Sequence, residues 1–266
     1  MLDVEFSQVS DPGRIRDHNE DYLAHLAPST PEEVRTRGWL FALADGVGGH
    51  DFGEVASRAA VEKLISGFKQ AGGGEAHTAL LPRLVQAANT HVFETAMATR
   101  KGGASMATTL VTCALRFDRA VIAHVGDSRC YLIRNRQARQ VTRDHTVANE
   151  QIRLGLITKG EANGLPTSSI LSRSLGNDMF VVVDSSELNV VSGDVLLLCS
   201  DGLHHSIKES DMVEAIAENP DLQAAAASLV NIANQRDGRD NISVQIIRVK
   251  SVERVGMYRG QPYKLR

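Results

Sequence analysis

Four aspartates in this chain of 266 residues have sequence settings that could bring their carboxylates together. Asp45, Asp127 and Asp201 each come shortly after an apolar run and lie beside a glycine, whereas Asp240 precedes the apolar run that begins at Ile242. If these runs are neighbouring strands, the carboxylates could meet at one edge of a sandwich. Carboxylates about 4 Å apart repel by roughly 4 kcal/mol per pair at an effective dielectric of about 20, so such a cluster needs cations. Converging oxygens suit Mg²⁺ or Mn²⁺, and two such ions about 3.5–4 Å apart can activate a water molecule.

The same aspartates also have a simpler interpretation. Asp-Gly is a common turn dipeptide, so each could mark an ordinary and unrelated turn. We expect the strand over residues 39–44 to break at Asp45-Gly46, and the glycines that follow would permit tight geometry or close approach of a ligand. A polar cluster over residues 14–21 adds Asp21 as a further acidic candidate before a strand. The pattern alone leaves a metal cluster and independent turns both open.

Composition excludes several classes of protein. Hydrophobic residues make up 42% and charged residues 23% of the chain, which is ordinary for a globular protein with a full core. A net charge of −3 gives no general attraction to nucleic acid or to an anionic membrane. No signal peptide or membrane-length apolar run is visible, and the three cysteines form no C-x-x-C pair. We therefore expect a soluble cytoplasmic protein without membrane or nucleic-acid partners.

The apolar patterns predict the elements that must position these residues. Amphipathic spacing predicts helices, and short β-type runs joined by brief turns predict antiparallel strands, because a parallel crossover needs a dozen or more residues. The predicted strands cover residues 4–9, 22–26, 38–44, 108–117, 119–125, 129–133, 138–142, 180–183, 195–199 and 242–249. The predicted helices cover residues 54–70, 77–100, 210–218 and 222–235.

Strands and helices occur in separate blocks, which favours an α+β sandwich over a doubly wound parallel sheet. We expect a single domain over residues 1–250, with a polar loop at 28–37 and a solvated basic tail at 251–266. The polar stretch around residues 146–170 interrupts the β-rich pattern and contains a helical part near 147–157. We interpret it as an inserted flap that could contribute to substrate selection.

The ordered motifs resemble those of the metal-dependent type-2C protein serine/threonine phosphatases, the PPM family, in their bacterial form. The resemblance extends from Gly13 to about Val249 and follows the family's order. Each motif is weak alone, but the ordered set is highly specific. The motifs are Gly13-Arg-Ile-Arg16 with Asn19-Glu-Asp21, Ala44-Asp-Gly-Val-Gly-Gly-His50, Val125-Gly-Asp-Ser-Arg129, Asp144-His145, Leu171-Ser-Arg-Ser-Leu-Gly176, Ser200-Asp-Gly202 and Arg239-Asp-Asn241.

This resemblance implies a metal centre with two catalytic ions, Mn²⁺ or Mg²⁺, and a weaker third one. The implied metal residues are Asp45, which would bridge both ions, and the Gly46 carbonyl, which would bind one of them. Asp201 and Asp240 would bind the other ion, Glu20 and Asp21 would hold the second side, partly through water, and Asp127 with Asp201 would bind the third ion. Arg16 would bind the substrate phosphate, since its planar fork suits that task better than lysine does. Asn241 would hydrogen-bond to the ligands rather than bind a metal itself.

The resemblance also implies a fold and a reaction. The fold is a four-layer αββα arrangement, an antiparallel β-sandwich with helices on both faces. The reaction is hydrolysis of phosphoserine or phosphothreonine on intracellular signalling proteins, by in-line attack of a water that the metals activate, without a phosphoenzyme. We expect a monomer that acts on phosphorylated proteins, opposing a bacterial serine/threonine kinase.

Two departures from the family pattern restrict what can be carried over. The histidine that directly follows Asp-Gly in eukaryotic members, where it is the proposed general acid, is Val47 here. His50 lies three residues later, as in bacterial relatives, and we do not assign it as the acid. The usual Gly-Thr-Thr before the middle strands is Ala107-Thr108-Thr109, which we expect to alter packing rather than chemistry.

Three other functions use some of the same features. A cysteine phosphatase would use C-x₅-R, which occurs at Cys113/Arg119 and Cys130/Arg136, but neither match contains the glycines that wrap a phosphate with backbone amides. A metal-dependent phosphodiesterase could use the same carboxylates, although the chain shows no basic patch for nucleic acid. A catalytically silent phosphoprotein-binding relative is the non-enzymatic alternative, and the presence of every expected metal aspartate counts against it.

Overall fold

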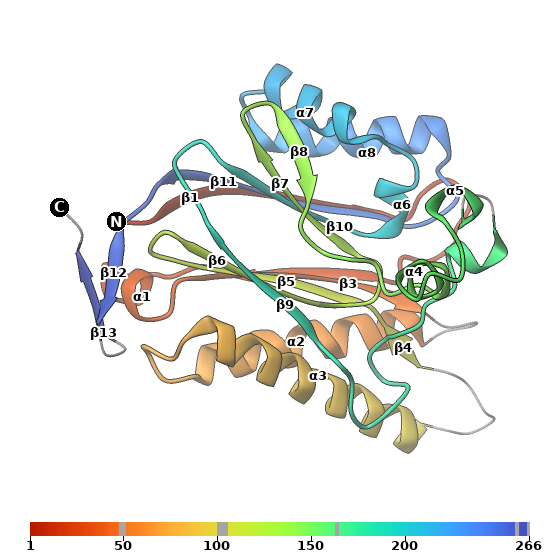
Figure 1. Ribbon diagram of the computed structural model, residues 1–266, viewed down its shortest axis with the longest axis horizontal. Coiled ribbons are helices and arrows are strands. Elements are labelled where there is room, and N and C mark those ends of the chain that lie inside the picture. Colours follow the sequence, from red (N-terminus) through yellow and green to blue (C-terminus); the bar gives the residue numbers. More distant parts are fainter. Residues whose placement is uncertain (48–51, 100–105, 163–164, 259–260, 265–266) are drawn as a thin grey trace.

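The computed structural model describes residues 1–47, 52–99, 106–162, 165–258 and 261–264 as two β-sheets packed face to face between two pairs of helices (Figure 1). One helix pair covers the outer face of each sheet, so the layers run helix, sheet, sheet, helix. This arrangement confirms the α+β sandwich predicted from the separate blocks of strands and helices.

All strand pairs in the two sheets are antiparallel, as the short connections predict. The first sheet, called the β1 sheet, has the order β1 (Asp3–Asp11), β11 (Ile242–Ser251), β10 (Val195–Cys199), β7 (Arg129–Arg134) and β8 (Gln137–Gln140). The second, called the β3 sheet, has the order β2 (Asp21–Leu26), β3 (Trp39–Val47), β5 (Leu110–Arg116), β6 (Arg119–Val125) and β9 (Asp184–Asn189), with β4 (Ala107–Thr108) paired to β3.

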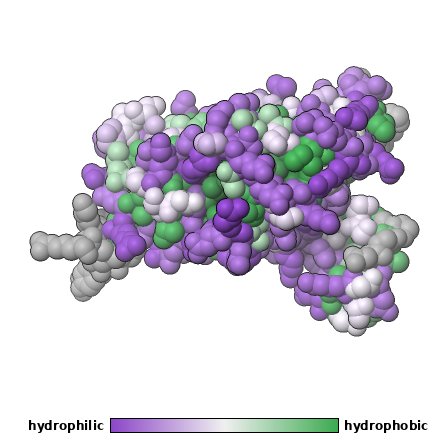
Figure 2. Space-filling view, turned by 90° about the horizontal axis from the view of Figure 1, so that it is seen from above, coloured by the Kyte–Doolittle hydropathy of each residue, from purple (hydrophilic) through white to green (hydrophobic). Residues whose placement is uncertain are grey.

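The helices divide into two covering pairs and several short segments. Helices α2 (Gly53–Gln70) and α3 (His77–Thr99) cover the β3 sheet, and α7 (Glu209–Glu218) and α8 (Leu222–Arg236) cover the β1 sheet (Figure 1). The short segments are α1 (Pro31–Thr36), α4 (Val147–Arg153), α5 (Lys159–Ala162), the 3₁₀ helix η1 (Pro166–Ser168) and α6 (Asp201–His204). Seen from the α7–α8 side, the surface is mainly hydrophilic with smaller hydrophobic groups (Figure 2).

Three apolar cores hold the layers together. Phe41 and Leu196 are fully buried between the two sheets. On α2, Ala60 and Leu64 are fully buried against the β3 sheet, four residues apart as the amphipathic pattern predicts. Leu229 of α8 is likewise fully buried against the β1 sheet. Burial of each large side chain contributes roughly 1.5–3 kcal/mol, so these cores fix the positions of the strand ends.

Residues 28–37 are not the loop that their polarity suggested, because they contain helix α1. Thr30 caps its N-terminus, where the Thr30 hydroxyl accepts a hydrogen bond from the Glu33 amide, and Pro31 occupies the first helical position. Both are standard helix-start features. A polar composition hid them, since only Val34 of this helix is buried.

The strand before Asp45-Gly46 does not break there, which corrects the expected turn. It continues to Val47, because β4 pairs with it and places Gly46 opposite Thr108. The Thr109 amide also donates to the Asp45 carbonyl over 2.9 Å. Asp45 is therefore held in an extended strand rather than in a flexible turn.

Residues 180–183 were predicted as a strand, and this prediction is wrong. The strand in this part of the chain is β9, a polar edge strand paired with β6. Exposed β-branched residues such as Val182 misled the pattern, since this side chain is 69% exposed.

The polar stretch after β8 holds α4, α5 and η1, and α4 and α5 lie at one end of the molecule (Figure 1). After β11, two short strands, β12 (Val255–Tyr258) and β13 (Gln261–Lys264), pair with each other. The domain limits and the flap function of residues 146–170 stay predictions. Within the described residues, no helix combines the length and hydrophobicity that membrane crossing requires.

Candidate metal and phosphate site

The strand register of the β3 sheet brings two of the predicted carboxylates together. Asp21 begins β2 and Asp45 lies near the end of β3, and the antiparallel pairing puts these two residues directly opposite each other. Directly opposed side chains have Cβ atoms only about 4.5–5.5 Å apart. Like charges at such a distance are destabilising unless a cation or a proton lies between them.

The β1 sheet contributes two more carboxylates from adjacent strands. Asp201 follows β10 and begins α6, and Asp240 lies just before β11, the antiparallel neighbour of β10. Asp127 comes from the turn that follows β6. The ends of both sheets therefore meet at one side of the sandwich, as the common position of the aspartates suggested.

A cleft of about 740 Å³ opens at this meeting point. Asp21 lies buried and does not line the cleft. The other predicted catalytic and metal residues all line it, namely Arg16, Glu20, Asp45, Gly46, Asp127, Asp201 and Asp240. The interpretation of the aspartates as unrelated turns is therefore excluded by their convergence.

The acidic side chains at this cleft outnumber the basic ones, so the cluster lacks enough positive charge to balance it. Burial, together with the nearby charges of Asp201 and Asp240, raises the pKa of Asp21 to about 7. Burial likewise raises the pKa of Asp45 well above its ordinary value, with Asp21 and Asp201 as the next causes. The pKa of Asp127 also rises to about 7, mainly because the side chain is buried and next because Asp201 is nearby. A bound cation would relieve this repulsion and let the carboxylates ionise.

The donor atoms fit a divalent cation. One oxygen of Asp21, Oδ2, accepts a hydrogen bond from the Ser200 hydroxyl over 2.7 Å. The other, Oδ1, is buried and has no hydrogen-bond partner among the described residues. An orphaned buried carboxylate oxygen beside other carboxylates is the donor type that Mg²⁺ and Mn²⁺ take.

The backbone around Gly46 is packed too closely for a side chain. A Cβ at this position would lie 2.2 Å from the Gly53 carbonyl oxygen and 2.8 Å from the Glu20 carbonyl oxygen. The Gly46 amide donates to that Glu20 carbonyl over 3.1 Å. Glycine therefore lets β3, the start of α2 and the Glu20 loop meet at the cleft.

Thr108 of β4 and the next residue, Thr109, hold Asp45 in place. The spacing of the motifs did not indicate this role. The Thr108 hydroxyl donates to the Asp45 carbonyl over 2.8 Å, and the Asp45 amide donates to the Thr109 hydroxyl oxygen over 3.0 Å. The Thr109 and Ser128 hydroxyls are 2.7 Å apart and link this network to the Asp127 turn. Such contacts limit movement of the carboxylate-bearing backbone.

Arg16 is the cation at the cleft edge. Its Nη2 donates to Asp240 Oδ2 over 2.8 Å, and half of its side chain is exposed to solvent. A guanidinium that keeps free N–H groups beside a carboxylate cluster can bind a phosphate in two-pronged fashion.

Asn241 lies behind the cleft and does not line it. Its Oδ1 accepts from the Glu20 amide over 2.8 Å, and its Nδ2 donates to the Pro12 and His18 carbonyls, each over 2.9 Å. It therefore holds the loop that carries Arg16 and Glu20. His50, with Gly48 and Gly49, lies outside the described residues.

The protein-family comparison shows which family the chain belongs to. Residues 17–243 match the family model described as Protein phosphatase 2C, which covers most of the chain. The chain belongs to the protein phosphatase 2C family. The PPM resemblance noted from the motifs is therefore correct, and so is the expected reaction class.

Relatives within the protein phosphatase 2C family are similar over nearly their full length. The serine/threonine phosphatase stp of Listeria innocua is 36% identical over 241 residues, which cover 90% of this chain and 93% of that protein. The structure of the S. agalactiae serine/threonine phosphatase has a TM-score of 0.84 at 29% identity and covers 93% of this chain and 100% of that one. The catalytic domain of the phosphatase PstP, solved with 2 manganese ions, has a TM-score of 0.79 at 30% identity, covering 94% and 100% of the two chains.

These comparisons show that the chain is a serine/threonine phosphatase that acts on phosphorylated proteins. The cysteine-based alternative has no support from this protein phosphatase 2C structure. Cys113 and Cys130 are buried, and burial raises the pKa of the Cys113 thiol to about 12. A thiol that stays protonated and has no access to solvent cannot attack a phosphate.

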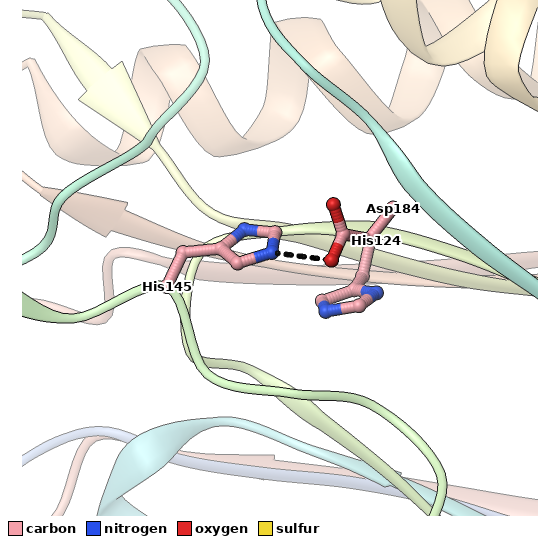
Figure 3. A group of neighbouring side chains, drawn as sticks. All are labelled: His124, His145 and Asp184. Atoms are coloured by element: carbon pink, nitrogen blue, oxygen red, sulfur yellow. Dashed lines mark ion pairs between the residues drawn. The ribbon is translucent and has the colours of Figure 1, made fainter. Parts of the chain in front are cut away.

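A second polar cluster lies at the edge of the β3 sheet, away from the cleft lining. The side chains of His124 on β6, Asp184 on β9 and His145 before α4 face one another (Figure 3), and their potential ligand atoms all lie within 4.8 Å. However, Asp184 already forms ion pairs with Arg143 at 3.1 Å and with Arg173 at 2.9 Å. Two guanidinium groups at the only carboxylate of the trio make this a poor site for a cation.

The trio instead supports the turn that carries Asp127. His145 Nδ1 accepts a hydrogen bond from the Gly126 amide over 3.1 Å, so its proton is on Nε2, which lies 3.3 Å from Asp184 Oδ2. The His124 ring stacks on the His145 ring at 4.7 Å. Burial lowers the pKa of His145 to about 4, so the ring is neutral and keeps this tautomer. In this protein phosphatase 2C chain His145 of the Asp144-His145 motif thus supports the turn that carries Asp127.

Proposed function

We propose that this phosphatase binds two divalent cations, Mn²⁺ or Mg²⁺, between the ends of its two sheets and uses them to hydrolyse phosphoserine and phosphothreonine. The observation that carries the proposal is the convergence of carboxylates with raised pKa values around the unpartnered Asp21 Oδ1. The manganese-containing PstP structure, similar over 94% of this chain, supports it.

Each side of the cleft has a distinct role in this proposal. Asp45 would contact both ions, and the Gly46 carbonyl would contact one of them. The remaining residues would hold one ion each: Asp201 and Asp240 from the β1 sheet, and Glu20 and Asp21 from the β2 side, partly through water. Asp127 with Asp201 would form a weaker third site on the side of the β6 turn.

The side chains of the protein prepare the substrate for hydrolysis. Bound divalent cations supply an activated water and neutralise charge on the phosphoryl oxygens. Arg16 would bind two phosphate oxygens and hold phosphorus in line for attack, while its contact with Asp240 fixes the direction of the guanidinium. No side chain needs to form a covalent bond to phosphorus.

The substrates that fit this site are phosphorylated proteins, and we propose that the enzyme opposes a serine/threonine kinase in the cytoplasm, acting as a monomer. Identification of the kinase needs a comparison of phosphoproteins between cells with and without the enzyme.

The proposal is tested by release of phosphate from a phosphothreonine peptide with Mn²⁺, with Mg²⁺ and after EDTA treatment. Wild type should be active with either ion and inactive with EDTA. Asp45→Asn, which keeps the size of the side chain but removes its charge, should lose at least about 100-fold in kcat, the range found for single electrostatic groups at active sites. Asp3→Asn, at an exposed position on β1, is the matched control. Activity that survives EDTA or Asp45→Asn would refute the proposal.

A further inference from the structure

Apolar side chains are exposed along the same cleft that holds the acidic cluster. Ile170, Phe180 and Val182 line the cleft, and they are 51%, 77% and 69% exposed. We call these three residues the apolar rail. Large apolar groups that gather in one exposed place, rather than singly, mark contact surfaces for other molecules.

The backbone that carries most of the rail is firmly held. Gln86 and Asn89 of α3 lie beneath it, and Asn89 is fully buried. The Asn89 side-chain amide donates to the Asp178 carbonyl over 2.9 Å and to the Met179 carbonyl over 3.0 Å. Gln86 donates to the Met179 carbonyl over 2.9 Å and accepts from the Val181 amide over 3.1 Å. These hydrogen bonds fix the backbone on both sides of Phe180.

Neighbouring side chains of the segment point the opposite way. Val181 and Val183 are partly buried and pack against the core between α2–α3 and the β3 sheet. Phe180 and Val182 are exposed whereas Val181 and Val183 are partly buried, so alternate side chains of this segment face opposite sides. The Arg173 guanidinium also donates to the Val182 carbonyl over 3.3 Å. The outward direction of the rail is therefore built into the packing.

The position of the rail indicates what binds there. When a phosphorylated side chain reaches Asp45 and Arg16, the polypeptide that carries it must cross the mouth of the cleft. The substrate residues on either side of the phosphorylated one then lie beside the walls of the cleft. Ile170, from the end of the flap region, and Phe180 with Val182, from the segment held by α3, are continuous with the metal residues in one cleft.

We propose that the apolar rail binds apolar side chains next to the phosphoserine or phosphothreonine of the substrate protein. The proposal rests on the phosphatase function proposed above and adds a preference for sequence. Burial of one or two aliphatic groups against a preformed surface discriminates by about 10–200-fold per group, so the rail would select substrates by their flanking residues.

The test uses two phosphothreonine peptides that differ only at the two positions on each side of the phosphothreonine, which are leucine in one and serine in the other. Each is assayed with Mn²⁺ against wild type and against the double variant Phe180→Ser, Val182→Ser. Val191→Ser is the matched control, because Val191 is an exposed valine that does not line the cleft. p-Nitrophenyl phosphate, which has no flanking residues, reports the state of the metal centre.

Wild type and Val191→Ser should show kcat/KM at least about 10-fold higher for the leucine peptide. The double variant should lose this preference, mainly through KM, and keep its activity on p-nitrophenyl phosphate. The proposal is overturned if wild type does not prefer the leucine peptide or if the double variant keeps the preference. It is also overturned if the double mutation changes a dimer into a monomer in solution without changing the preference, since the rail would then bind a second copy. Failure of wild type to hydrolyse even p-nitrophenyl phosphate would instead refute the proposed function itself.

Discussion

Asp21 and Asp45 face each other across two paired strands, so the proposed metal centre brings two acidic side chains close together. The Asp21 side chain is buried and the Asp45 side chain is partly buried, with little compensating positive charge, and the fold tolerates them because protons or cations can neutralise them. This local cost is consistent with a site that is prepared for its ligand before the ligand arrives.

The pKa of Asp21 gives a pH dependence to the stability of the metal-free protein. Burial raises this pKa to about 7, whereas an aspartate in an unfolded chain has a pKa of about 3.9. Between these values the folded state holds a proton that the unfolded state has lost, so the contribution of Asp21 to stability is present below about pH 4 and is lost as the pH rises through about 7. Urea unfolding of EDTA-treated protein should therefore show that wild type loses stability between pH 5 and pH 7.5.

Asp21→Asn is the variant that isolates this effect. It should be more stable than wild type at pH 7.5 by about 1–3 kcal/mol without metal, and the difference should shrink at pH 5, since one pKa unit corresponds to about 1.4 kcal/mol. Asp3→Asn should follow wild type at both pH values. An equal pH slope for wild type and Asp21→Asn would contradict the assigned cause.

Gly46 gives a second prediction at a single residue. Gly46→Ala would place a methyl group against two backbone carbonyl oxygens that cannot easily move away, so we expect a loss of about 1–3 kcal/mol of stability together with weaker Mn²⁺ binding. Gly72→Ala, where an added Cβ meets no atom within 4 Å, is the matched control and should change stability by less than about 0.5 kcal/mol. Equal effects of both changes on chemical unfolding would refute the packing explanation.

At the scale of elements, the strand ends determine which side chains meet. Apolar runs that end in aspartate beside glycine predicted the place of Asp45, Asp127 and Asp201, because strand hydrophobicity and strand termini are local properties of sequence. The exact pairing of Asp21 with Asp45 depends on register, which local sequence does not determine. Helix α1 and edge strand β9 were missed because their residues are mostly polar and exposed.

Hydrogen bonds between distant elements could not be predicted from local pattern either. Thr108 and Thr109 bond to Asp45 from residues more than sixty positions away, and Asn89 holds a segment about ninety positions further on. The C-terminal stretch expected to be solvated begins with the paired strands β12 and β13, which depend on contact with each other. Such contacts follow from the assembled layers and have no signal in composition or periodicity.

Asn89 provides a prediction for the link between α3 and the cleft wall. Its side chain also accepts from the Gly176 amide over 2.9 Å, so Asn89→Ala would leave the Gly176 amide and the Asp178 carbonyl without this partner, whereas the Met179 carbonyl would keep its hydrogen bond from Gln86. We expect a loss of about 2–4 kcal/mol of stability and faster amide hydrogen exchange over residues 176–181. Asn231→Ala, at an exposed position of α8, is the control and should leave that segment unchanged. Unchanged exchange in Asn89→Ala would show that the segment is held by other contacts.

At the scale of the whole molecule, the proposed cations lie between the two sheets. Asp45 belongs to the β3 sheet, whereas Asp201 and Asp240 lie at strand ends of the β1 sheet. Ions held by both would join the two halves of the sandwich in addition to the apolar layer between them. Cation binding should then stabilise the entire domain and not just the cleft.

Calorimetric unfolding tests this coupling. An ion present at about 100 times its Kd adds about 2.7 kcal/mol, and a chain of this size gains about 2–4 °C per kcal/mol, so Mn²⁺ should raise Tm by about 5–10 °C over EDTA-treated protein. The shift should be largely lost in Asp45→Asn and retained in Asp3→Asn. A single transition that does not move with Mn²⁺ would contradict a bridge between the sheets.

The most direct test of the metal centre is calorimetric titration of metal-free protein with Mn²⁺, followed by phosphate release from a phosphothreonine peptide in the same sample. Two divalent ions per chain should bind before activity is complete, with any third ion binding more weakly. Asp45→Asn should fail to bind both ions tightly and should release no phosphate above background. Full activity with a single bound ion, or unchanged binding in Asp45→Asn, would contradict the account.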